Sequence, residues 1–234
     1  MTEELFLSDS YLKECHARVL KADDRGIYVD RTVFYAMGGG QPGDTGVLIR
    51  ADGSEIPITD TRKDCESGDY LHIPNSTANL PEIDEDVLLR IDWERRYRLM
   101  RMHSCLHILC AVILAPVTGG SIRDGSGRLD FDLPEPPNKA EIEARLNELI
   151  QEDRPMALQW ITDQELDRNP KLVRTMSVKP PAGTGRVRLV NFKGIDLQPC
   201  GGTHVLSSAE IGRVKVVKIE KKGRLNRRVT VEFA

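Results

Sequence analysis

The stretch WERRYRLMRMHSCLHILCAVILA, residues 93–115, has the pattern of one long amphipathic helix. Large apolar residues recur along it at the three- and four-residue spacing of a single helix face: Leu99, Met102, Leu106, Leu109 and Ile113. Asp92 can cap the first turn, and Pro116 ends the pattern. The character of the chain changes at this helix, so we predict a domain boundary near Asp92, giving domains at 1–92 and 93–234.

Short β-branched or alternating runs fill the chain before this helix, and turns rich in Gly, Asp, Asn and Ser separate them. The predicted strands are 17–23, 26–35, 45–50, 55–62, 69–74 and 85–92. Because the strands follow one another closely with no helix between them, we predict a small antiparallel β-barrel over residues 1–92.

Residues 93–234 mix helical and strand patterns, which predicts an α+β domain. A strand at 127–133 has Leu129 and Phe131 inward, and a second helix follows at 139–154. We predict a loop at 180–185 and three successive strands of one antiparallel sheet, with helices covering one face of that sheet. These strands are 186–199, 211–222 and 227–234. The fold class of the whole chain is therefore α+β, with a barrel domain first.

The composition is ordinary for a soluble protein: 234 residues, 40% hydrophobic and 29% charged. No run approaches the ~18–20 apolar residues of a membrane span, and the N-terminus lacks the features of a signal peptide. The five cysteines are odd in number and scattered, which argues against a secreted disulfide framework. We therefore expect a cytoplasmic location.

Two short motifs, HSCLH at 103–107 and CGGTH at 200–204, each place two metal-binding side chains four positions apart. His103 and His107 lie on the same helix face and can bind one ion. Cys200 and His204 offer a second pair, and the glycines between them permit a tight turn. Imidazole and thiolate ligands suit Zn²⁺ better than Mg²⁺ or Ca²⁺. The sequence leaves open whether one ligand is displaceable, the coordination expands, or the ion only orders the site.

The formal net charge of −3 does not indicate a nucleic-acid binder, but two local basic segments stand out. The first comprises Arg90, Arg95, Arg96, Arg98 and Arg101. The second comprises Lys215, Lys218, Lys221, Lys222, Arg224, Arg227 and Arg228. A solvated helix face and a phosphate contact explain the first equally well. The second contains a predicted hairpin turn with a basic tip, for which phosphate contact is the better interpretation.

Together these motifs resemble the editing domain of alanyl-tRNA synthetase and its free-standing relatives, the AlaX proteins of medium length. The resemblance rests on FYAMGGGQPGDTG (34–46), HSCLH (103–107), GIDLQPCGGTHV (194–205), EIGRVKVVK (210–218) and KKGRLNRRV (221–229). It runs nearly from end to end, and no part of the chain resembles an adenylate-forming domain. The chain departs from the family pattern at Met37, where members often carry an acidic residue.

The resemblance implies a trans-editing hydrolase that deacylates mischarged tRNA(Ala), chiefly seryl-tRNA(Ala), with glycyl-tRNA(Ala) as a second candidate. It implies one Zn²⁺ per chain, and mischarged tRNA(Ala) is the expected partner, with no membrane and no DNA. The sequence does not settle how many chains assemble. The implied zinc ligands are His103, His107, Cys200 and His204.

The remaining candidate site residues each have a structural alternative. Thr203, Gln41 and Asp44 are candidate catalytic residues; for Thr203 we expect a hydrogen bond to the substrate, and the alternative is that its hydroxyl stabilises the turn. The candidate substrate-binding residues are Gly38, Gly39, Gly40 and Asp196. The glycines would let backbone approach the substrate or simply join two strands. Asp196 could orient a metal-bound imidazole or cap a strand end.

Two other functions compete with this interpretation. The chain could be a non-catalytic tRNA-binding module whose zinc is structural. A small-molecule esterase or metallopeptidase fits less well, because Ser104 stands where HExxH enzymes carry a glutamate and no G-x-S-x-G motif is present.

Overall fold

The computed structural model describes residues 2–175 and 185–234, and the chain divides into two compact units, Met1–Tyr97 and Arg98–Ala234. The division falls inside helix α1 (Trp93–Val112). The domain limits expected from the sequence, 1–92 and 93–234, place the boundary at the start of this helix and stay a prediction. Among the described residues, no helix combines the length and apolar character needed to cross a membrane.

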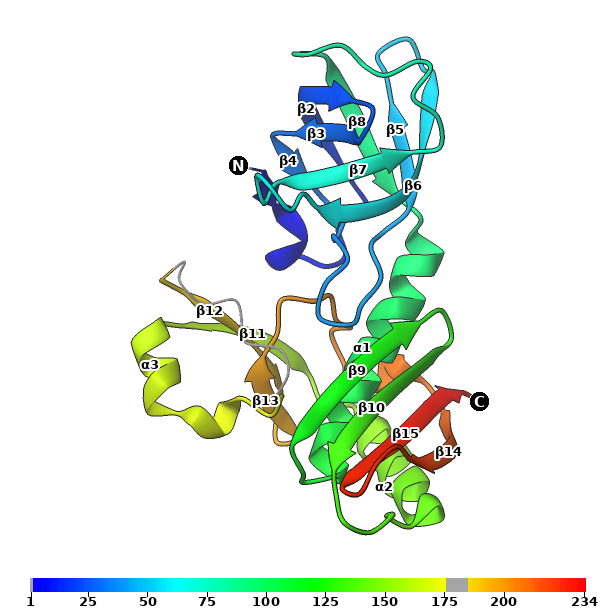
Figure 1. The fold of residues 1–234 in the computed structure, drawn as a ribbon, viewed down its shortest axis with the longest axis vertical. Helices are drawn as coiled ribbons and strands as arrows, with labels where there is room; N and C mark the ends of the chain where they lie inside the picture. Colours follow the sequence, from blue (N-terminus) through cyan, green and yellow to red (C-terminus); the bar gives the residue numbers. More distant parts are fainter. Residues whose placement is uncertain (1, 176–184) are drawn as a thin grey trace. The chain divides into compact units, whose positions relative to one another are not determined.

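The first unit contains a closed six-stranded barrel in the order β2-β3-β7-β6-β5-β8, drawn in blue to green in Figure 1. Its strands are β2 (Glu14–Asp23), β3 (Gly26–Val29), β5 (Gly46–Ile49), β6 (Glu55–Lys63), β7 (Tyr70–Pro74) and β8 (Asp86–Ile91). All six neighbouring pairs are antiparallel. Alternate residues such as Val87, Leu89 and Ile91 point into an apolar core. The predicted antiparallel barrel is confirmed.

One predicted strand of the barrel is divided in two. Residues 26–35 form β3 and then the short β4 (Arg31–Thr32), which pairs in parallel with β1 (Glu3–Glu4) rather than joining the barrel. The 3₁₀ turn η1 (Leu5–Leu7) follows β1 and contributes Phe6, which packs edge-on against Tyr35. The extra pairing therefore ties the N-terminus to the outside of the barrel.

In its described residues, 98–175 and 185–234, the second unit has two separate antiparallel sheets, so the expectation of one sheet is wrong. One has the order β14-β15-β10-β9 and the other β11-β12-β13. Their strands are β9 (Val117–Arg123), β10 (Ser126–Asp132), β11 (Met156–Ile161), β12 (Val187–Phe192), β13 (Asp196–Pro199), β14 (Val214–Lys221) and β15 (Asn226–Phe233). After β13 the chain passes through CGGTH and the turn η3 (Ser208–Ile211), and β14 then pairs with β15 instead of β13. Figure 1 shows the two sheets apart.

Helix α1 packs against β10 of the four-stranded sheet. A Cβ placed on Gly127 would lie only 2.8 Å from Met102 Sδ, so this strand position needs a glycine to admit the helix side chain. Leu129 and Phe131 are buried, as predicted. The predicted Asp92 cap is also confirmed, because its Oδ1 accepts a hydrogen bond from Arg95 N at 3.1 Å.

Three shorter helical segments complete the second unit: α2 (Lys139–Gln151), α3 (Asp163–Arg168) and the 3₁₀ turn η2 (Pro170–Leu172). Asn138 caps α2, and Asn147 of α2 donates a hydrogen bond to Val214 O at the start of β14. The loop expected at 180–185 lies outside the described residues except for Gly185.

Candidate metal centre

Helix α1 places His103 and His107 side by side on one face. Their ring centroids are 5.3 Å apart, which follows from the four-residue spacing on the helix. Both rings are almost fully buried, with exposed fractions of 8% and 5%. Two imidazoles held this close inside the protein need a partner for their inward nitrogen atoms.

The CGGTH loop brings the second pair of ligands to the same place. One ligand atom from each of His103, His107, Cys200 and His204 lies within 4.8 Å of every other. Cys200 Sγ is 3.5 Å from His103 Nε2, and the ring of His204 is 4.3 Å from that of His103. The structure therefore brings together the four side chains that the resemblance implied as zinc ligands.

Hydrogen bonds from outside the loop hold it in position. Ser104, between the two helix histidines, accepts a bond from Val205 N on its hydroxyl at 3.1 Å. Arg188 Nη1 donates to Cys200 O and Gly202 O at 2.9 and 2.8 Å. Because α1 and β12 both contribute, the loop is fixed by two elements far apart in the sequence.

The chemistry of the four donors fits a resident cation. His204 is fully buried, and neither of its ring nitrogens has a hydrogen-bond partner within residues 2–175 and 185–234. Burial alone would raise the pKa of the Cys200 thiol, but the adjacent His103 and His204 lower it well below its usual range. A thiolate and three imidazoles, one without any other partner, form the donor set typical of zinc sites.

Asp196 on β13 orients one of the imidazoles. Its Oδ2 lies 3.0 Å from His107 Nδ1 and accepts a further bond from Gln198 Nε2 at 2.8 Å. Burial lowers the pKa of His107, but its bonds to Asp196 and Cys200 outweigh this and raise it to about 9. A bond from Nδ1 to a carboxylate fixes the ring and leaves Nε2 directed to the metal position. The contact supports the orienting role of Asp196; its assignment to substrate binding stays a prediction.

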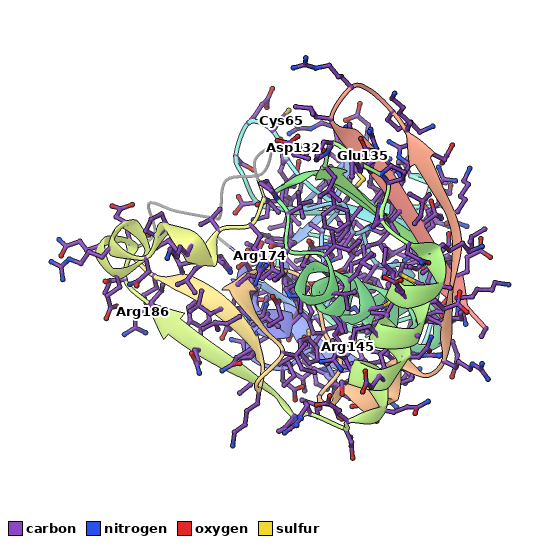
Figure 2. The ribbon with its side chains drawn as sticks, turned by 90° about the horizontal axis from the view of Figure 1, so that it is seen from below. Cys65, Asp132, Glu135, Arg145, Arg174 and Arg186 are labelled. Atoms are coloured by element: carbon purple, nitrogen blue, oxygen red, sulfur yellow. The ribbon has the colours of Figure 1, made fainter. Side chains whose placement is uncertain are left out.

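Arg174 is a member of this centre that sequence reasoning missed. Its Nε lies 3.7 Å from Asp196 Oδ1, and its Nη1 donates to Cys110 O at the end of α1. Figure 2 labels this side chain. Arg174 thus balances the charge of the buried carboxylate that orients His107. A single arginine in an irregular segment gives no pattern from which this contact could have been found.

The glycine-rich segment of the first unit forms a minimal two-residue turn. Gly38 and Gln41 exchange both backbone hydrogen bonds, at 3.1 and 2.9 Å. Gly39 and Gly40 between them have φ of +56° and +84°, values that residues with a side chain rarely adopt. The three glycines expose backbone, as substrate binding would require. They also join two chain segments, so the structure agrees with both explanations, and their role in substrate binding stays a prediction.

Asp44 is engaged in a buried ion pair. Arg96 and Asp44 are both completely buried, and the guanidinium binds the carboxylate through Nε at 2.9 and 3.0 Å and through Nη2. Asp44 Oδ2 also accepts a bond from Tyr35 N at 2.6 Å. Gln41 and Thr203 are fully buried as well. Their catalytic roles stay predictions, but Asp44 has a structural contact that the sequence did not indicate.

Comparisons with known proteins agree with these motifs. Residues 187–230 match the family model described as Threonyl and Alanyl tRNA synthetase second additional domain, and residues 6–95 match tRNA synthetases class II (A). Alanyl-tRNA editing protein AlaX-M of Saccharolobus solfataricus is 36% identical over 233 residues, covering 98% of both chains. The AlaX-M protein of Methanosarcina barkeri is 37% identical over 239 residues with the same coverage. This chain belongs to the AlaX-M family.

The AlaX-M chain also matches parts of longer proteins. Alanyl-tRNA editing protein AlaX-L of Pyrococcus horikoshii is 36% identical over 239 residues, which make up 96% of this chain and 56% of that protein. Alanine–tRNA ligase of Pyrobaculum calidifontis is 33% identical over 94% of this chain and 25% of its own length.

The arginines of the first basic segment of this AlaX-M chain form hydrogen bonds and ion pairs within the protein. Arg96 is buried, Arg95 donates to Gly43 O at 2.8 Å, and Arg101 donates to Ile211 O. Arg90 pairs with Glu14, and Arg98 pairs with Asp124. Phosphate contact is wrong for Arg96, because a fully buried guanidinium cannot reach a phosphate. Neither explanation weighed for the segment, solvated face or phosphate contact, describes that residue.

The C-terminal basic segment does form the predicted hairpin, between β14 and β15. Two of its arginines have structural contacts. Arg227 is 4% exposed and donates to Gly223 O and Asn226 O within the turn, and Arg228 binds both oxygens of Asp130. Phosphate contact by the hairpin stays a prediction, and it would fall to other basic residues such as Lys221 and Arg224.

Proposed function

We propose that this AlaX-M protein hydrolyses the ester joining a wrongly attached amino acid to tRNA(Ala), chiefly serine with glycine as the second candidate. The observation that carries the proposal is the meeting of His103, His107, Cys200 and His204 at one buried point. It occurs in a chain that matches alanyl-tRNA editing proteins over 98% of its length.

The four side chains would hold one Zn²⁺. When bound, zinc supplies positive charge that polarises oxygen atoms and favours deprotonated water. The chain's own residues prepare the site: Asp196 orients His107, while Ser104 and Arg188 hold the CGGTH loop in place. Burial of the centre strengthens any electrostatic interaction with a developing oxyanion.

Editing of serine is needed because the site that attaches alanine to tRNA cannot strongly reject serine. A pocket for alanine discriminates only ~10²-fold against an amino acid that merely adds a hydroxyl, so a second hydrolytic site is needed. That second site must favour serine by hydrogen-bonding its hydroxyl, since an alanine would leave the partner unpaired. Thr203, buried beside His204, is our candidate for this contact.

The test is single-turnover deacylation of seryl-, glycyl- and alanyl-tRNA(Ala) with and without a chelator. We expect release of serine, slower release of glycine, and little release of alanine. His107→Ala should abolish release, whereas the matched control His16→Ala, at an exposed histidine of β2, should not. Retained seryl-tRNA in the presence of folded, zinc-loaded protein would overturn the proposal.

The alternative is a non-catalytic tRNA-binding module. One observation favours it: four protein side chains converge on the centre, and zinc sites closed by four protein ligands are usually structural. Such a module would bind charged and uncharged tRNA alike and release no amino acid. Binding assays with both forms, run beside the deacylation assay, separate the two functions.

A further inference from the structure

One face of the three-stranded sheet β11-β12-β13 is directed toward the metal centre. In its register Phe192 lies opposite Asp196, Val190 opposite Gln198, and Trp160 opposite Arg188. Residues directly opposite one another in an antiparallel pair share a face, as do alternate residues along a strand. Asp196 and Gln198 both reach His107, so the whole set faces the centre.

Trp160 is the exposed member of this face. Its exposed fraction is 48%, whereas Arg188 opposite it is 5% exposed and Phe192 is completely buried. The neighbouring Ile161 points to the other face, where it packs with Leu166 and Val187. Trp160 therefore presents a large aromatic surface to solvent on the side of the sheet that carries the centre.

Trp160 also lies at a suitable distance from the CGGTH loop. Arg188 is paired with Trp160 on one side and donates to Cys200 O and Gly202 O on the other. Trp160 is on β11 and Cys200 directly follows β13, two strand spacings away. At ~4.8 Å per spacing this is roughly 10 Å, a length that a single nucleoside can bridge.

We propose that Trp160 is the stacking surface for the nucleobase of the acylated nucleotide, and this rests on the function proposed above. The ester of that nucleotide would lie at the metal centre and its base on the indole ring. An unpaired 3′ nucleotide offers a free π-face, and aromatic side chains bind such bases by stacking, whatever their sequence. The buried Arg188 fixes the relative position of the two ends of this subsite.

Binding can be measured without any catalysis. The chain has two tryptophans, so Trp93→Phe leaves Trp160 as the only indole fluorophore. The probe is 3′-serylamino-3′-deoxyadenosine, whose amide resists hydrolysis, and the control probe is serinamide, which lacks the base. We expect saturable quenching by the nucleoside probe alone. Unchanged fluorescence up to the solubility limit, or equal quenching by serinamide, would overturn the proposal.

Kinetics supply the second test. Trp160→Ala should raise the half-saturating concentration of seryl-tRNA(Ala) by roughly 5- to 150-fold, the effect of losing one base–aromatic stack. Trp160→Phe should recover most of the loss. The matched control is Gln159→Ala, at an exposed residue of the same strand on the opposite face. If Trp160→Ala has the same kinetics as Gln159→Ala, the stacking role is refuted and the proposed deacylation is unaffected. If the unmodified protein releases no serine, the proposed function fails, and the quenching experiment still shows whether Trp160 binds the nucleobase.

Discussion

Replacing Arg96 by alanine should destabilise the first unit far more than any surface arginine would. The change removes the countercharge of Asp44, which is 1% exposed, and breaks bonds to Ser10 O and Val33 O. Removing one partner of a buried ion pair costs ~3–5 kcal/mol, because the other charge stays buried without compensation. Arg90 on β8, in the same unit, pairs with Glu14 at the surface, where such pairs contribute ~0.2–1 kcal/mol.

The assay is equilibrium unfolding in urea, in a Trp160→Phe background so that only Trp93 reports. Trp93 stacks on Tyr97 in the first unit and is a local probe of that unit. With m of ~1–3 kcal/mol/M, the Arg96→Ala midpoint should fall by roughly 1–5 M and the Arg90→Ala midpoint by much less. If the two variants unfold within ~1 kcal/mol of each other, the ion pair does not have the stabilising role assigned to it.

The other predictions concern acid stability, metal affinity and packing. Burial lowers the pKa of His72 to about 4, below the ~6.5 of an unfolded chain, so the unfolded state binds more protons between these values. The free energy of unfolding should therefore fall by roughly 3 kcal/mol as pH drops from ~6.5 to ~4. In His72→Leu the urea midpoint should depend much less on pH over this range; a pH dependence equal to that of the unmodified protein would show that His72 is not the titrating group. Asp196→Asn should weaken zinc binding ~10- to 100-fold in chelator competition, and equal affinity would show that the carboxylate does not orient His107. Gly43→Ala should lower the melting temperature, since its Cβ would lie 2.1 Å from Thr61 O. An unchanged melting temperature would mean that the backbone at Thr61 can shift to make room for the methyl group.

The sequence predicted those features that local pattern determines. Strand alternation and turn residues located the barrel strands, and apolar spacing with the Asp92 cap located α1. HSCLH and CGGTH each indicated a pair of metal ligands through the spacing within the motif, whereas the meeting of the two pairs was implied by the family resemblance and is confirmed by the structure. In these cases the deciding interactions lie within a few residues of one another.

Features that depend on distant partners were not predictable in the same way. Arg96 has the sequence context of an exposed helix start, and only its partner Asp44, 52 residues earlier, makes it a core residue. The division into two sheets depends on β10 pairing with β15 and on β11 pairing with β12, which are strands far apart in the sequence. Strand β9, VTGGSIR, carries a glycine pair in place of a clear alternation, so its pattern gave no strand prediction.

Ser104 limits which chemistry this helix can acquire. In HExxH metallopeptidases the residue after the first histidine is a glutamate that acts on water. Here that position is fully buried, and its hydroxyl is bonded to Val205 N in the opposing loop. A glutamate introduced at 104 would place its carboxylate against packed backbone instead of an open coordination position. Conversion of this scaffold into a peptidase would therefore need a redesigned loop as well as the point substitution, although both scaffolds begin from the same pair of helix histidines.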